Sequence, residues 1–471
     1  MNAYPASERF PARTVATIFA SALAIRWIYA LVLYHTMAND GLMGVDSTTF
    51  VANAEAFSHS IQTGTVSGTQ WLGTFPYTMP LYQWLTTLPF LVFGKSGAIA
   101  YVLIQGAFDS CTCVLVHLIA RSIDRRIAFW SGVVAVVNPT QIVLSSLIYN
   151  DTIFTFFVAL AFFWISRWRS KSNWPNALLI GCALGAAALI RVSIAPWAVG
   201  AIGLLGVFAL LKASLKSDLL KLTSIGLIFG MSLGVIAARN SSQYGTYSLS
   251  PQGGDYLAFY IFPLAKEAQD RTPFAVSLEA IMQRTTERFG PPSTNPFEQS
   301  TRYQAIGREA LHNEINFSSL VKSWAFGILI NLASPAYLLS PPVAHLAREG
   351  FYGTAGNSFA EKVFNFVFRS GNNTYTWLLI VGTTGLFCFR IIQCLGIYTL
   401  MRSRFDLQVV LLAVSWIVYL LLLNGPIASP KYRLPLEPMF NIMMGAGLMA
   451  ILDRRRLNKS GDQQRRNGLA A

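Results

Sequence analysis

The chain has 471 residues, of which 53% are hydrophobic and only 12% charged, and its formal net charge is +14. Soluble globular proteins carry roughly 25% charged residues because a water-facing surface needs them, so this composition excludes a soluble protein. The mean hydropathy of +0.44 instead predicts a chain that exposes much of its surface to lipid. Its basic residues lie in short loops between apolar blocks, which excludes a nucleic-acid-binding face lined by basic and aromatic side chains.

Ten apolar blocks have about the length of a membrane span. A helix crosses the hydrocarbon core of a bilayer with roughly 20 apolar residues. We therefore predict an all-α polytopic membrane protein with a bundle of about ten to twelve transmembrane helices. The predicted spans are residues 13–34, 97–120, 128–147, 151–168, 176–192, 195–212, 219–238, 374–400, 407–424 and 433–452.

Two further apolar stretches, residues 79–94 and 317–342, have no clear orientation from hydropathy alone. If 79–94 crossed the membrane, the basic residues at 121–126 would lie outside. If 317–342 crossed alone, the arginines at 454–456 would lie outside as well. Because basic loops stay on the cytoplasmic side, we predict that both stretches are helices in the outer interface. Both chain termini are then cytoplasmic.

This topology divides the chain into three parts. Residues 1–238 form an N-terminal transmembrane module, whose first external loop is 35–96. Residues 239–373 form a second external segment with an interfacial helix, and within it 300–316 has the pattern of an amphipathic helix. Residues 374–471 form a C-terminal transmembrane module with a basic cytoplasmic tail. Transporters usually join their spans by short loops, so two long external segments indicate that the protein acts in these segments rather than along a pore.

Arg26 and Asp109 lie near the middle of their predicted spans, at matching depth. A charge in the bilayer core is costly, and such residues tend to pair with one another. We predict that these two side chains pair and fix the packing of the first two spans.

The first external loop carries two carboxylates, Asp40 and Asp46, just after the first span. The pattern from Asp46 onward is helical, with Phe50, Ala54 and Phe57 on one face. Asp46 then sits at the helix start, where it either only caps the helix or serves as a general base at the membrane surface. Asp40 either contacts an acceptor or turns the chain before Gly41.

Arg191 lies about one helical turn inside the outer end of an otherwise apolar predicted span. An arginine in the membrane costs ~2.5–3.5 kcal/mol on insertion scales and by default indicates a function. An ion pair with Asp151, at similar depth, is the competing role. Asp151 is equally well placed to cap the next span.

Four motifs, in order along the chain, resemble those of polyprenyl-phosphate-dependent glycosyltransferases of the GT-C fold, the protein O-mannosyltransferase and aminoarabinose transferase-like superfamily. They are residues 46–50, 76–82, 138–151 and 430–438. Three positions depart from the family pattern, and at one of them Phe50 stands where the family has a tyrosine. Ser47 stands where the family has a second acidic residue, and Lys431 stands where it has an arginine, so the bidentate fork that an arginine presents to phosphate is lost.

The resemblance implies an inverting glycosyltransferase that moves a sugar from a polyprenyl-phosphate carrier to a lipid, glycan or protein acceptor. It implies Asp46 as general base. Asp40 and Asp151 are secondary acidic candidates, chosen from the residues themselves. A leaving phosphate needs cations nearby, and the candidates near the outer boundary are Arg191, Lys431 and Arg433. For Lys431 and Arg433 the alternative is ordinary flanking charge at the interface. The expected location is a bacterial inner (plasma) membrane, with the active site facing the periplasm or exterior.

Two alternatives remain open. A polysaccharide polymerase or ligase would rely on cations more than on Asp46. A flippase or transporter of lipid-linked sugar would need more polar groups within the membrane than Arg26, Asp109 and Arg390. The sequence has no zinc-ligand spacing and no phosphate-cradling glycine loop, so we expect no metal and no cofactor. The expected partners are the lipid-linked donor, the acceptor and membrane lipids, and not nucleic acid.

Overall fold

The computed structural model describes residues 12–210, 215–369, 371–402 and 407–468. Every regular element in these residues is a helix, which confirms the predicted all-α class. The bundle consists of α1 (Ala12–Met37), α4 (Gly97–Arg121), α5 (Arg125–Val137), α6 (Pro139–Leu144), α7 (Asn150–Ser170), α8 (Trp174–Ile190), α9 (Ala195–Leu210), α10 (Leu215–Tyr244), α18 (Asn373–Arg402), α19 (Leu407–Asn424) and α20 (Glu437–Gly468).

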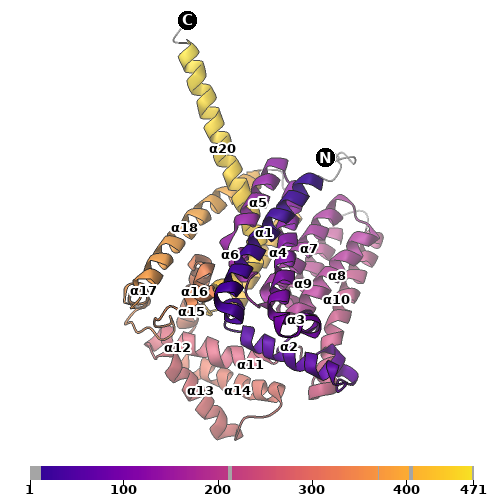
Figure 1. The fold of residues 1–471 in the computed structure, drawn as a ribbon, viewed down its shortest axis with the longest axis vertical. Helices are drawn as coiled ribbons and strands as arrows, with labels where there is room; N and C mark the ends of the chain where they lie inside the picture. The colour runs from indigo at the N-terminus through magenta and orange to yellow at the C-terminus, as the bar shows by residue number, and fades with distance from the viewer. Residues whose placement is uncertain (1–11, 211–214, 370, 403–406, 469–471) are drawn as a thin grey trace.

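The remaining helices belong to the two predicted external segments and gather mainly at one end of the bundle (Figure 1). They are α2 (Ser47–Gln62), α3 (Pro80–Phe93), α11 (Gln252–Tyr256), α12 (Phe262–Asp270), α13 (Phe274–Phe289), α14 (Pro296–Glu314), α15 (Phe317–Ala333), α16 (Pro341–Ala344) and α17 (Phe359–Phe368). Short 3₁₀ turns are η1 (Ala38–Leu42), η2 (Gly68–Leu72), η3 (Gly94–Ser96), η4 (Val192–Ile194), η6 (Ala336–Leu339) and η7 (Pro430–Leu436), and η5 (Leu257–Ile261) is a π turn.

Figure 1 also shows how the ends of the bundle differ. Helix α1 begins, and α20 ends, at the end opposite to α2 and α11–α14. The helix predicted over 300–316 is present as α14. The predicted boundary at 238 falls inside α10, which continues to Tyr244, whereas the boundary at 373 coincides with the start of α18.

Seven helices of the described residues are long and apolar enough to cross a membrane, and eight if α14 and α15, which meet at 116°, count as one broken span. Two of the predicted spans, 176–192 and 407–424, are shorter apolar helices, α8 and α19. The predicted span 195–212 ends with two residues outside the described range. Length and composition thus support an integral membrane protein with at least seven apolar spans.

The prediction of one continuous span over 128–147 is wrong, because the chain breaks at Asn138–Pro139 between α5 and α6. Pro139 has no N–H to donate and disfavours a helical conformation in the residue before it. Asn138 accordingly adopts ψ 114°, and its side chain caps α6 by accepting from the backbone N–H groups of Thr140 and Gln141.

The predicted pair of Arg26 and Asp109 is confirmed. Arg26 Nε lies 2.6 Å from Asp109 Oδ2, and both side chains are fully buried. Arg26 also donates to the carbonyl oxygens of Ala135 (3.0 Å) and Val136 (2.7 Å), at the end of α5. Carbonyls at a helix end lack intrahelical donors, so this one guanidinium joins α1 and α4 to the break before Pro139.

The ambiguous stretch 79–94 forms α3, separated from α4 by the turn η3. Gly94 in this turn has a φ of +55°, a conformation that favours glycine. A Cβ on Gly97 would lie 2.7 Å from Phe90 Cα, so α3 packs closely against the start of α4. The stretch 317–342 is likewise interrupted, and forms α15, η6 and α16. The interfacial position of both stretches stays a prediction.

Candidate active site

Asp46 lies immediately before α2, at the helix start predicted from the sequence. Three contacts hold this segment against the residues that precede α7. Ser47 Oγ donates to the carbonyl of Ile148 (2.8 Å), and the N–H of Val45 donates to the hydroxyl of Tyr149 (2.9 Å). A Cβ on Gly44 would lie 1.9 Å from the Tyr149 hydroxyl, so only glycine allows this approach.

The carboxylate of Asp46 forms an ion pair with Lys431, which belongs to η7. The helix-cap alternative does not describe this side chain, because it makes no capping hydrogen bond to α2. The Asp46 side chain is 45% exposed and that of Lys431 only 13%. The carboxylate is therefore fixed by a mostly buried cation and still open to a second molecule.

A second ion pair joins Asp151, in the first turn of α7, to Arg191. Arg191 is the residue directly after α8 and has an extended backbone. The expectation that it lies one turn inside a helical span is therefore wrong: the apolar pattern continues through Val192, but the helix ends at Ile190. The Asp151 side chain is 4% exposed and that of Arg191 25%.

The ring of Tyr432 connects the two pairs. The guanidinium carbon of Arg191 lies 5.7 Å from its centroid, and Lys431 Nζ lies 5.2 Å from it. Cations at this distance from an aromatic face are attracted by the ring quadrupole. Lys431 also lies 5.3 Å from the ring of Tyr149. Two carboxylates and two cations thus form one charge-balanced cluster, which we call the Asp46 cluster.

Arg433 is not part of the Asp46 cluster. It is 1% exposed. Its Nε lies 2.7 Å from Glu437 Oε1, and its other nitrogens donate to the hydroxyl of Thr140 and to the carbonyls of Asn331 and Ser334, each at 2.9 Å. With its donors engaged inside the fold, Arg433 holds η7 to its neighbours, and we remove it from the predicted phosphate-binding set.

Asp40 also lies apart from the cluster. It is exposed in η1, where its backbone carbonyl accepts from the N–H of Met43 at 3.3 Å. A Cβ on Gly41 would lie 2.3 Å from the carbonyl oxygen of Leu33. Of the two interpretations of Asp40, this tight turn favours the one in which it turns the chain.

The comparisons with known proteins agree with this architecture. Residues 75–236 match the family model described as dolichyl-phosphate-mannose-protein mannosyltransferase, a range that includes two of the four motifs and Arg191. The apo oligosaccharyltransferase of Archaeoglobus fulgidus is similar with a TM-score of 0.50 at 12% identity, over 96% of this chain and 52% of that one. The chain has a GT-C-like fold.

ArnT from Cupriavidus metallidurans is similar with a TM-score of 0.39 at 15% identity, over 93% of this chain and 77% of that one. No curated protein sequence matches the chain. The chain spans about half the length of the archaeal oligosaccharyltransferase. The resemblance to GT-C glycosyltransferases expected from the four motifs is confirmed by the family match and the fold.

Sequence reasoning missed the tyrosines that contact the Asp46 cluster. Tyr149 and Tyr432 lay within quoted motifs, but only the structure shows that they contact the cations. Burial raises the pKa of Tyr149 to about 12, so its hydroxyl keeps its proton at neutral pH. An acid was missed as well: Asp255 accepts a hydrogen bond of 3.1 Å from Tyr77, and burial raises the pKa of its carboxyl. The position of Tyr77 in the motif at 76–82 was the available signal in the sequence.

Proposed function

We propose that the chain is a membrane glycosyltransferase that moves a sugar from a polyprenyl phosphate to an envelope acceptor, with Asp46 as general base. The acceptor is a lipid, a glycan or a protein. The observation that carries the proposal is the half-exposed carboxylate of Asp46, fixed by Lys431 from a segment 385 residues away. The family model adds support, because dolichyl-phosphate-mannose is a sugar on a polyprenyl phosphate.

The chemistry suits one carboxylate and two cations. The acceptor oxygen bonds to the anomeric carbon as the bond from that carbon to the phosphate oxygen breaks on the opposite face, so the configuration inverts. The hydroxyl proton passes to Asp46. The polyprenyl phosphate leaves as a stable anion that needs no acid, and Lys431 and Arg191 stabilise its charge.

The ion pairs suggest how the donor prepares the base. In the ion pair, the Asp46 carboxylate is held by Lys431. A donor phosphate competes with Asp46 for Lys431, and once Lys431 turns to the phosphate, the carboxylate is released toward the acceptor. Asp151 stays bound to Arg191 and orients its guanidinium. Asp151 therefore acts in the proposal as a positioning residue.

The test is sugar transfer in membranes that contain the full chain, supplied with radiolabelled polyprenyl-phosphate sugars. We expect transfer to an envelope acceptor and a product whose anomeric configuration is opposite to that of the donor. Membranes without the chain are the control. A product that retains the donor configuration contradicts the single-displacement mechanism, and a lack of transfer from every carrier contradicts the enzyme assignment.

We further propose that the protein resides in a bacterial inner membrane with the Asp46 cluster facing the exterior. The cluster lies beside α2, on the side of the bundle where the external segments gather (Figure 1). An external enzyme has no pool of nucleotide sugars to draw on, which agrees with a lipid-linked donor.

A further inference from the structure

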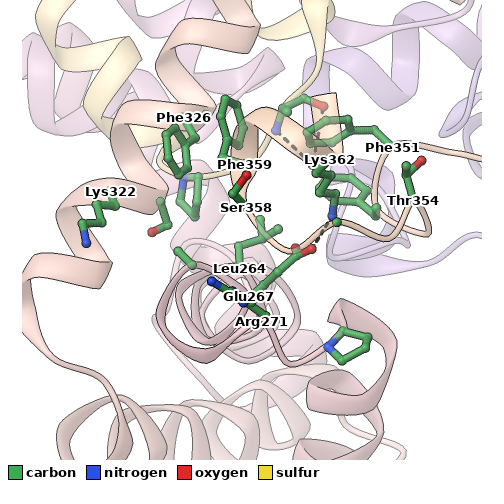
Figure 2. A pocket seen from close by; sticks show the side chains of 18 of the residues that line it. Leu264, Glu267, Arg271, Lys322, Phe326, Phe351, Thr354, Ser358, Phe359 and Lys362 are labelled. Carbon is green, nitrogen blue, oxygen red and sulfur yellow. Dashed lines mark hydrogen bonds and ion pairs between the residues drawn. The ribbon is translucent and has the colours of Figure 1, made fainter. Parts of the chain in front are cut away.

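A cavity of about 640 Å³ lies between α12, α15 and the loop that leads into α17. Figure 2 shows the side chains around it, with Lys322 on one side and Lys362 on the other. This volume is within the range of roughly 300–1,000 Å³ that is typical of small-molecule sites. None of the residues assigned to the Asp46 cluster lines it.

The charges that line the cavity are unbalanced. Arg271, Lys322 and Lys362 are cationic and Glu267 is the one lining carboxylate, so the lining has a formal charge of +2. Glu267 pairs with Lys362, whose side chain is 7% exposed. Arg271 and Lys322 are exposed, and among the described contacts neither has an anionic partner. The unmatched cations favour an anionic ligand.

The rest of the lining suits a saccharide. Phe326 and Phe359 are stacked with ring centroids 3.7 Å apart, and Lys362 Nζ lies 5.0 Å from the ring centroid of Phe351. Asn357 and Ser358 add amide and hydroxyl groups at the same wall. The outer faces of the Phe326–Phe359 stack, beside amide and hydroxyl groups, match a sugar ring, which presents C–H groups on its faces and hydroxyls at its edge.

The cavity shares a wall with the segment that carries Lys431. Pro426 and Ala428 line it, and Ala428 stands three positions before Lys431. The hydroxyl of Tyr352, another lining residue, accepts a hydrogen bond of 2.9 Å from the N–H of Ala428. A ligand in the cavity is therefore linked through one short segment to the cation that pairs with Asp46.

We propose that this cavity binds an anionic saccharide, a sugar that carries a phosphate or carboxylate group. The sugar ring packs against the phenylalanines, and its anionic group contacts Lys322 and Arg271. This binding does not depend on transfer, and it goes beyond the proposed function, which needs only the Asp46 cluster.

Binding is measured on the purified full chain by ligand-observed NMR, which detects millimolar affinities. The probes are glucose 6-phosphate and glucuronate as anionic sugars, glucose as the neutral sugar, and inorganic phosphate as the anion alone. The variant is Arg271→Gln with Lys322→Gln, two exposed positions. The matched control is Arg308→Gln, an exposed cation of α14 outside the cavity. We expect both anionic sugars to bind and the double variant to weaken their binding by about tenfold.

Each other outcome overturns a stated part of the proposal. If glucose binds as tightly as glucose 6-phosphate, the ligand does not need an anionic group. If inorganic phosphate binds as tightly as glucose 6-phosphate, the ligand does not need a sugar ring. If the double variant binds normally while Lys431→Gln does not, the sugar occupies the Asp46 cluster and the cavity is not its site. Transfer that fails while the cavity still binds anionic sugars overturns the proposed function and not the cavity.

Discussion

At the scale of single residues, the site depends on small differences between neighbouring positions in the chain. Lys431 and Arg433 belong to the same short turn, yet Lys431 contacts Asp46 while Arg433 is enclosed by backbone carbonyls and Glu437. Both are cations near the expected outer boundary, so their sequence context gave them the same predicted role. Only the path of η7 separates them.

The lysine at 431 provides a direct test of the donor contact. We predict that Lys431→Gln lowers the rate of transfer at low donor concentration by about 10²-fold, because the variant loses the cation that stabilises the charge of the leaving phosphate. Lys431→Arg, which restores the residue of the family motif, retains more of the activity. Initial rates against donor concentration check both variants. Equal losses in Gln and Arg variants would contradict a role for the positive charge.

Ser47 explains why the chain lacks the second acid of the family motif. Its side chain is fully buried and its hydroxyl donates to the carbonyl of Ile148. We predict that Ser47→Asp does not increase transfer and lowers stability by about 1–3 kcal/mol, because a buried carboxylate there keeps only the N–H of Gly44 as a donor and faces the Ile148 carbonyl, an acceptor oxygen. Thermal unfolding in detergent measures the stability. A stable, more active Ser47→Asp variant would show that the missing acid is still required.

At the scale of helices, the break at Asn138–Pro139 brings the buried polar groups of three helices together. The Asn138 amide donates to Glu437 (2.9 Å) and Asn441 (2.8 Å), while its carbonyl oxygen caps α6. The break also supplies the carbonyls that Arg26 binds. The side-chain N–H groups and the side-chain carbonyl oxygen of Asn138 thus all have hydrogen-bond partners, as is usual for a buried polar group.

The hydrogen bonds of Asn138 predict that a single substitution there lowers the stability of the protein strongly. Asn138→Asp removes both donors and places a charge next to Glu437, so we expect a loss of about 3 kcal/mol or more in stability. Asn373→Asp, at an exposed position at the start of α18, is the matched control and should change little. Thermal unfolding of both variants in the same detergent makes the comparison. An unchanged midpoint for Asn138→Asp would contradict the described network.

The sequence predicts a helix or a contact when the interaction that produces it acts between residues close in the chain, or when a residue can have only one partner. The start of α2, the helix α14 and the Arg26–Asp109 pair were predictable, because periodicity and the cost of a charge in the membrane act within a short stretch or force one partner. The end of α8 before Arg191 was not, since the residues on both sides are apolar. The pairing of Asp46 with Lys431 spans 385 positions and needs the whole fold.

At the scale of the whole molecule, the two ends of the helix bundle differ in the segments that they carry. Helix α20 ends, and α1 begins, on the side opposite to α11–α14 (Figure 1). Arg126, in the basic stretch 121–126, forms an ion pair with Asp453 of α20 and so lies toward the first side, and the Asp46 cluster lies toward the second. A polarity of this kind fits an enzyme whose lipid-linked donor is embedded in the membrane beside its water-facing acceptor.

This polarity is tested by accessibility in intact cells. In a variant whose five native cysteines are replaced, we predict that a cysteine at Glu279 of α13 reacts with a membrane-impermeant maleimide. A cysteine at Arg454 of α20 should react only after the membrane is opened. Both positions are exposed in the fold. Labelling of Arg454→Cys in intact cells, or protection of Glu279→Cys, would reverse the proposed orientation.

The most direct test of the central claim is the rate of sugar transfer by Asp46→Asn. This change keeps the shape of the side chain and removes the base. Glu55→Gln, at an exposed position of α2, is the matched control. We predict that transfer by Asp46→Asn falls by about 10²–10⁴-fold, while Glu55→Gln transfers at the wild-type rate and both variants insert and unfold normally. Transfer by a folded Asp46→Asn at the wild-type rate would show that Asp46 is not the base.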